Sequence, residues 1–288
     1  MTQAHIKTVQ CLSPAGLHRM AYKEWGDPSN PNVLVCVHGL TRVSDDFDAL
    51  AKAMANDYRV ICPDIVGRGR SEHLRDPNFY QVPQYVSDMV TLLARLDVAS
   101  IQWLGTSMGG LIGMILASLP GNPVRKLLLN DIGPSLNAEA LKRIGEYVGL
   151  KVHFATFDEA WQYVRAISLS FGPHSDEQWR KLASDVMRQD AEGKWTFVYD
   201  PALAVPFKAT TAQSVQVDEQ RLWAAYEAIS CPTLVVRGAD SDLLTRETAA
   251  AMSQRGPKAQ VVEIAGVGHA PTFLSDTQIA IAKNFFLG

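Results

Sequence analysis

Residues 103–110 read WLGTSMGG, and this stretch decides the fold class. It places Ser107 between Gly105 and Gly109. The apolar run IQWL up to Leu104 is typical of a buried strand, and LIGMILASL after the motif is typical of a helix. A bare G-x-S-x-G would fit any tight glycine turn. Between a strand and a helix, it predicts a sharp turn that exposes the serine hydroxyl, and we therefore interpret Ser107 as a nucleophile.

The chain on both sides of this motif alternates between strand-like and helix-like segments. Unbroken apolar runs are typical of strands that are buried on both faces of a parallel sheet. Helix-like stretches between such runs predict parallel crossovers, and hence an α/β fold. The strand-like runs are VLVCV (33–37), RVICP (59–63), IQWLG (101–105), KLLLN (126–130) and TLVVRG (233–238), and the helix-like stretches are 46–55, 84–96 and 108–119.

The alternation stops after residue 132. Residues 133–228 are mostly helix-like and hold four of the six tryptophans, so we interpret them as a helical cap, or lid, inserted into a core formed by 1–132 and 229–288. Trp161, Trp195 and Phe171 are candidate walls of a substrate pocket. Aromatic residues at helical spacing also fit the cap's own core.

Composition narrows the function further. The 288 residues are 47% hydrophobic, carry a formal net charge of −3 and show no basic stripe, which argues against nucleic acid as a partner. No apolar run reaches the roughly 18 residues of a membrane span, and the start MTQAHIKTVQ does not resemble a signal peptide, so we expect a cytoplasmic protein. The four cysteines lie far apart without zinc-ligand spacing, which predicts buried free thiols and no metal site. We expect a small-molecule substrate and either a monomer or a homodimer.

A serine hydroxyl attacks a carbonyl only when a base takes its proton and a third group orients that base. His269, in the glycine-rich loop AGVGHAPTF, is the candidate base because it follows the last strand-like run. For the acid, RGADSDLL offers Asp242, which we favour, and Asp240, which we expect in the turn itself. Asp131, in NDIGP, is a third candidate, although we expect it to brace the start of the cap.

The oxyanion that forms during such an attack needs two backbone N–H donors. Met108, directly after the nucleophile, and Leu40, in the loop HGLTR, are the candidates. His38 is expected to fix that loop through hydrogen bonds to the backbone. Arg42 is a candidate for binding a substrate carboxylate, and a surface salt bridge is the alternative for it.

The loop PDIVGRGRS (63–71) has two glycines and two arginines, but it lacks the phosphate-binding patterns G-x-x-x-x-G-K-[ST] and G-x-G-x-x-G. We therefore expect a tight loop near the site, with Arg68 and Arg70 in structural ion pairs.

In order and spacing, HGLTR, PDIVGRGRS, GTSMGG, RGADSD and GVGHAP resemble the motifs of the α/β-hydrolase superfamily over residues 33–273. The likeness is to the branch with a helical cap, which includes carboxylesterases, proline iminopeptidase-like enzymes and carbon–carbon bond hydrolases. It implies a mostly parallel eight-stranded sheet, a Ser107–Asp242–His269 triad and no cofactor. The expected function is hydrolysis of a small or medium carboxylic ester. The alternatives are cleavage of a carbon–carbon bond in a diketone acid and slow-turnover ligand binding.

Overall fold

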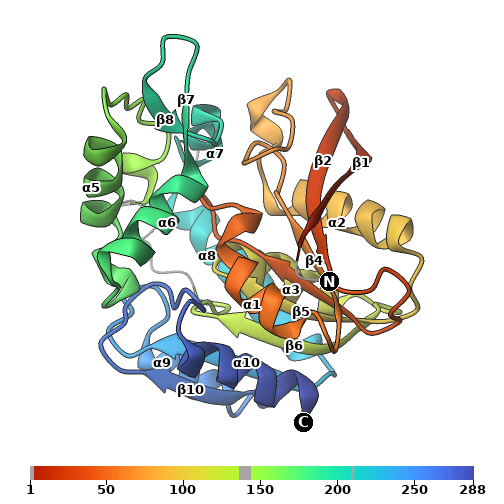
Figure 1. Cartoon of the computed structure of the whole chain (residues 1–288). Helices are drawn as coiled ribbons and strands as arrows, with labels where there is room; N and C mark the ends of the chain where they lie inside the picture. Colours follow the sequence, from red (N-terminus) through yellow and green to blue (C-terminus); the bar gives the residue numbers. More distant parts are fainter. Residues whose placement is uncertain (1–2, 136–143, 209–210) are drawn as a thin grey trace.

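The computed structural model describes residues 3–135, 144–208 and 211–288, and Figure 1 shows its arrangement. A single eight-stranded sheet runs through the core in the order β1-β2-β4-β3-β5-β6-β9-β10. Only the pairs β1–β2 and β2–β4 are antiparallel, and the other neighbours are parallel. The strands are β1 (His5–Ser13), β2 (Gly16–Trp25), β3 (Val33–Val37), β4 (Arg59–Pro63), β5 (Ile101–Thr106), β6 (Val124–Asn130), β9 (Thr233–Gly238) and β10 (Gln260–Ile264). The predicted mostly parallel eight-stranded sheet is confirmed.

Helices cover both faces of this sheet. One face packs α2 (Val82–Leu96), α3 (Met108–Ser118), α8 (Ala212–Ala228) and α9 (Arg246–Met252) into the larger hydrophobic cluster. The other face packs α1 (Asp48–Met54) and α10 (Asp276–Leu287) into a second cluster. Because β3 lies in the middle of the sheet, all five of its residues are buried, as the unbroken run VLVCV predicts.

Between Asn130 and Thr233 the chain leaves the sheet. This insertion contains α5 (Phe157–Ile167), α6 (Asp176–Val186), the hairpin β7 (Met187–Gln189)–β8 (Trp195–Phe197), α7 (Val205–Lys208) and α8. The helices α5 and α6 stand beside the carboxyl ends of the strands in Figure 1, and they share a small hydrophobic core of their own. Helix α8 instead packs against α3 of the main core. Residues 136–143 and 209–210 of the predicted cap lie outside the described residues.

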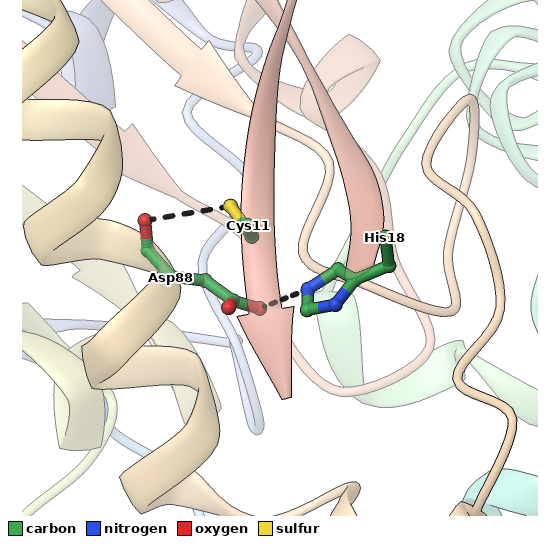
Figure 2. A group of neighbouring side chains, drawn as sticks. All are labelled: Cys11, His18 and Asp88. Carbon is green, nitrogen blue, oxygen red and sulfur yellow. Dashed lines mark hydrogen bonds and ion pairs between the residues drawn. The ribbon is translucent and has the colours of Figure 1, made fainter. Parts of the chain in front are cut away.

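A buried polar trio joins the antiparallel edge of the sheet to α2 (Figure 2). Cys11 and His18 are opposite each other in the β1–β2 register, and the His18 ring is hydrogen-bonded to Asp88 of α2 at 3.0 Å. The Cys11 thiol points at the backbone carbonyl of Asp88, and Gln84 donates to its second carboxylate oxygen. The four cysteines are free thiols, and three of them are buried as expected, whereas Cys231 is only partly buried. The trio also has the ligand types of a metal site. Because both Asp88 oxygens already accept hydrogen bonds, we interpret it as a polar clamp.

Within the described parts of the chain, no helix combines the length and the apolar character that a membrane crossing requires.

Candidate active site

Ser107 sits at the turn between β5 and α3, with φ 51° and ψ −114°, a strained conformation for a residue with a side chain. The flanking glycines make the turn possible. A Cβ on Gly105 would collide with the backbone of Gly109, and a Cβ on Gly109 would collide with the carbonyl of Val37. The predicted sharp strand-to-helix turn is therefore present, and it places the serine at the amino end of α3, where the helix dipole favours negative charge.

Three side chains form one hydrogen-bonded chain at this turn. The Ser107 hydroxyl lies 3.0 Å from Nε2 of His269, and Nδ1 of His269 lies 2.7 Å from Oδ2 of Asp131. Asp131 is fully buried and directly follows β6. Its Oδ1 accepts a hydrogen bond from the Gly238 amide, and its Oδ2 also accepts one from the Ser241 hydroxyl. A carboxylate held in this way is well placed to orient an imidazole.

The expectation that Asp242 orients His269 is wrong in this structure, because the carboxylate on His269 Nδ1 belongs to Asp131. The reason is topological. Since β6 and β9 are neighbours in the sheet, the loops that follow them end at the same edge, and either can approach His269. A left-handed backbone at Asp131 (φ 54°) accompanies this placement. The loop after β9 supports that carboxylate through Gly238 and Ser241, while Asp242 lines the cavity.

The loop after β3 lies against the nucleophile. A Cβ on Gly39 would be 3.7 Å from the Cβ of Ser107, and Leu40 lines the cavity beside it. His38 is buried below, where its Nδ1 donates to the Gly39 carbonyl and its Nε2 accepts from the Ile65 amide. Burial lowers the pKa of His38 to about 4, which agrees with this neutral tautomer. The expected structural role of His38 is confirmed, and the Leu40 and Met108 amides remain the predicted oxyanion donors.

A cavity of about 350 Å³ opens above Ser107 and His269, between the core and the insertion. Its walls include Tyr163 and Phe171 from the insertion. Phe171 is thus a wall, as predicted, but Trp161 and Trp195 are not among the lining residues. They belong to the hydrophobic core of the insertion. Helical spacing shows which side chains share a face of α5, and it does not show whether that face meets the cavity or a neighbouring helix. Trp195 is not helical, because it begins strand β8.

Arg42 also lines the cavity, but its guanidinium is already paired. It makes two hydrogen bonds to Asp46, at 2.8 and 2.6 Å, and a third to the backbone carbonyl of Leu182 on α6. The alternative of a salt bridge is therefore the observed one, although Arg42 is mostly buried. A substrate carboxylate would have to compete with Asp46.

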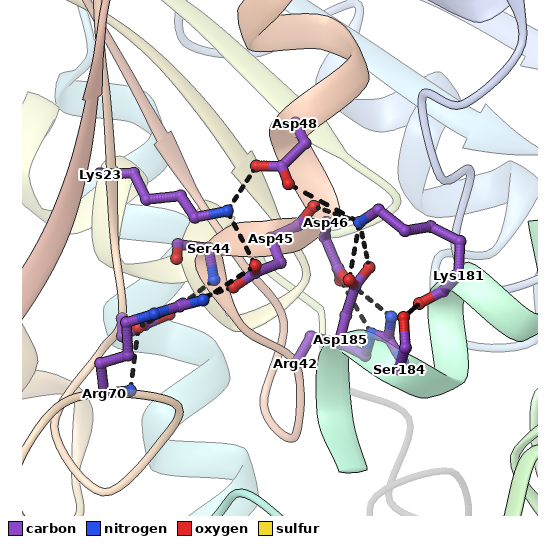
Figure 3. A network of polar contacts seen from close by, with 11 residues as sticks. Lys23, Arg42, Ser44, Asp45, Asp46, Asp48, Arg70, Lys181, Ser184 and Asp185 are labelled. Atoms are coloured by element: carbon purple, nitrogen blue, oxygen red, sulfur yellow. Dashed lines mark hydrogen bonds and ion pairs between the residues drawn. The ribbon is translucent and has the colours of Figure 1, made fainter. Parts of the chain in front are cut away.

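This pair belongs to a charged network that connects α6 to the loop before α1 (Figure 3). Lys181 on α6 bonds Asp185 at 2.6 Å and reaches the Asp45 carbonyl, and Lys23 bonds both Asp45 and Asp48. Burial, reinforced by the negative charge of Asp46, raises the pKa of Asp185 to about 6 against the opposing effect of Lys181. The insertion is therefore attached to the core through a charged network in which Asp185 changes its charge near pH 6.

We expect the free energy of unfolding to fall by about 1 kcal/mol between pH 5 and pH 7 because of Asp185. Since its pKa is raised in the native state, the native protein binds the proton more tightly than the unfolded chain does. The stability that results is complete below about pH 4 and is lost as the pH rises through about 6. Urea unfolding of intact protein and Asp185→Asn at both pH values measures this. An identical pH dependence in the two proteins would contradict it.

Comparisons with known proteins identify the family to which this fold belongs. The model of the alpha/beta hydrolase fold family matches residues 32–276. A 3-hydroxybutyrate-oligomer hydrolase of Cupriavidus necator is 60% identical over 283 residues, which cover 97% of each protein. Esterase YbfF of Escherichia coli is 26% identical and covers 83% of this chain and 87% of its own length. The crystal structure of an alpha/beta hydrolase from Novosphingobium aromaticivorans is 36% identical, with a TM-score of 0.88 over 100% of this chain and 99% of that one.

These relatives include ester-cleaving hydrolases, so the predicted enzyme class is confirmed at the level of a hydrolase. The family model spans most of the sequence and the Novosphingobium aromaticivorans hydrolase shares the fold, so the chain belongs to the alpha/beta hydrolase fold family.

Proposed function

We propose that this chain hydrolyses carboxylic esters through Ser107, His269 and Asp131. The observation that carries the proposal is the hydrogen-bonded chain from the Ser107 hydroxyl through His269 to the buried Asp131, at the floor of a cavity. A hydroxyl with a base at 3.0 Å and a carboxylate behind that base has the arrangement that nucleophilic acyl transfer requires.

The reaction follows from these positions. His269 Nε2 takes the Ser107 proton as the oxygen attacks the ester carbon, and Asp131 stabilises the imidazolium that forms. The amides of Leu40 and Met108 bind the oxyanion. His269 then gives the proton to the leaving alcohol, and a water molecule, activated by the same histidine, hydrolyses the acyl-enzyme.

We further propose short oligoesters of a 3-hydroxy acid as the substrate class. The support is the Cupriavidus necator relative, whose similarity covers 97% of this chain and therefore includes the insertion that encloses the cavity. A cavity of about 350 Å³ lies within the usual range for small-molecule sites, roughly 300–1,000 Å³. Its lining combines apolar side chains, such as Ile167 and Leu169, with the hydroxyls of Ser170 and Thr272.

Turnover of two substrate sets tests the proposal. We expect the intact protein to release free acid from linear 3-hydroxybutyrate dimer and trimer, and to hydrolyse p-nitrophenyl esters with an optimum at short acyl chains. Activity on a vinylogous diketone acid without activity on either ester set would favour carbon–carbon bond cleavage. A single burst of one equivalent of product, with no further turnover, would favour a slow ligand-binding protein. Either result would reject the proposed function.

A further inference from the structure

Arg68 carries a positive charge into the core of the protein. The side chain is fully buried in the loop between β4 and α2. In the part of the chain that the structure describes, no ion pair includes Arg68. The neighbouring Arg70, which is partly exposed, pairs with Asp45 and Asp64. The expected ion pair is therefore confirmed for Arg70 and wrong for Arg68. A buried guanidinium is costly unless its hydrogen bonds are made, so its partners identify its role.

Those partners include both predicted oxyanion residues. Nε of Arg68 donates to the backbone carbonyl of Leu40 at 2.8 Å, and Nη2 lies 3.5 Å from Sδ of Met108. Nη1 donates to the Val66 carbonyl at 2.7 Å. The rigid planar fork of one arginine thus connects the loop after β3 to the first residue of α3. These are the two segments whose separation sets the size of the oxyanion site.

The surrounding loop is shaped to hold the arginine in this inward position. Gly67 and Gly69 on either side of it have φ values of +84° and +56°, which favour glycine. The aromatic rings of Tyr80 and Tyr85 lie 5.8 and 4.9 Å from the guanidinium carbon, which helps to accommodate a cation inside the protein. The Gly69 amide also bonds the Val198 carbonyl of the insertion.

From this geometry we infer that Arg68 is a positioning residue for the oxyanion site: it fixes the spacing of the Leu40 and Met108 segments and places a buried positive charge behind them. This inference rests on the proposed ester hydrolysis. In the free protein no carboxylate of the described residues forms an ion pair with this cation. When the transition state develops negative charge on the far side of Leu40 and Met108, the attraction increases. An interaction that is stronger in the transition state than in the ground state raises kcat more than it changes KM.

The test measures p-nitrophenyl butyrate hydrolysis, thermal unfolding and inhibition by butylboronic acid, which forms a tetrahedral anion on an active serine. We expect Arg68→Met to lower kcat by about 10- to 100-fold with KM within about threefold, and to weaken boronate binding in proportion to the loss of kcat/KM. Arg68→Lys keeps the charge and loses the planar fork. Its kcat and its boronate affinity are expected to lie between those of the intact protein and those of Arg68→Met.

Arg70→Gln is the matched control, because it removes an adjacent arginine that bonds neither oxyanion residue. A purely structural Arg68 would lower the unfolding temperature of Arg68→Met and leave kcat and boronate binding within twofold of the intact protein, and this overturns the inference. If both Arg68 variants fail to fold, the volume-conserving substitution Met108→Leu tests the inference instead. It should lower kcat and boronate affinity by about threefold, and unchanged values would overturn the inference. Activity that persists in Ser107→Ala would instead reject the proposed function itself.

Discussion

Replacing Ser107 with alanine is expected to lower kcat for p-nitrophenyl butyrate and for 3-hydroxybutyrate trimer by about 10⁴-fold or more. The substitution removes the hydroxyl that lies 3.0 Å from His269 Nε2, so no acyl-enzyme can form on Ser107. The predicted oxyanion donors remain, because they are backbone amides. A small residual rate above the uncatalysed reaction is therefore expected.

The unfolding temperature of Ser107→Ala should stay close to that of the intact protein, which separates lost chemistry from lost fold. Ser118→Ala is a matched control on the same helix, since the Ser118 hydroxyl bonds the Ile115 carbonyl in the last turn of that helix. It should retain full activity. Equal rates for Ser107→Ala and the intact protein would remove Ser107 from the mechanism.

The second large effect is expected for Asp131, the carboxylate that is hydrogen-bonded to His269. We expect Asp131→Asn to lower kcat by about 10³- to 10⁴-fold with little change in KM. An amide at this position has nearly the same shape, but its NH₂ group would face Nδ1 of His269. The ring would then carry its proton on Nε2, where it cannot accept one from Ser107. The loss should therefore appear in kcat at all pH values where the enzyme folds.

Asp242→Asn is the variant to compare with Asp131→Asn, because the two aspartates follow neighbouring strands. Asp242 lines the cavity without being the carboxylate on His269 Nδ1, so we expect its kcat to fall by at most about tenfold. A loss of 10³-fold in Asp242→Asn together with an active Asp131→Asn would return the acid role to Asp242.

The sequence predicts the central strands because they are buried on both faces, and an unbroken apolar run such as VLVCV is typical of such strands. It predicts Ser107 because part of the glycine requirement of the turn is local: a Cβ on Gly105 would collide with the backbone of Gly109. The collision that Gly109 avoids is with the Val37 carbonyl of the neighbouring strand β3. His269 follows from chain order, and the structure brings it to Ser107.

The acid is different, because its identity depends on which of two loops at one sheet edge approaches His269, and that is decided by tertiary packing. Ser241 gives the clearest illustration. Its hydroxyl bonds Asp131, so the very loop that offered Asp242 serves the other aspartate. Nothing in the spacing of NDIGP or RGADSDLL reports this contact.

The other residues whose contacts were not predicted differ in whether the sequence carried a local signal for those contacts. Arg42 and Asp46 are four residues apart, a spacing typical of helical ion pairs, so their pairing was foreseeable. The partners of Arg68 were not, because Leu40 and Met108 come from loops 28 and 40 residues away. Trp161 and Trp195 are not cavity walls for a third reason, since the sequence does not show whether the apolar face of a helix or strand turns to a cavity or to a neighbouring element.

Covalent labelling tests the central claim, nucleophilic attack by Ser107 with His269 and Asp131 behind it, most directly. The protein would be treated with a fluorophosphonate, its remaining esterase activity followed, and the modified peptide identified by mass spectrometry. We predict one phosphonyl group on Ser107, loss of activity in proportion to labelling, no labelling of Ser107→Ala and much slower labelling of Asp131→Asn. Full activity after exhaustive treatment, or a label on another residue that tracks the loss of activity, would contradict the account.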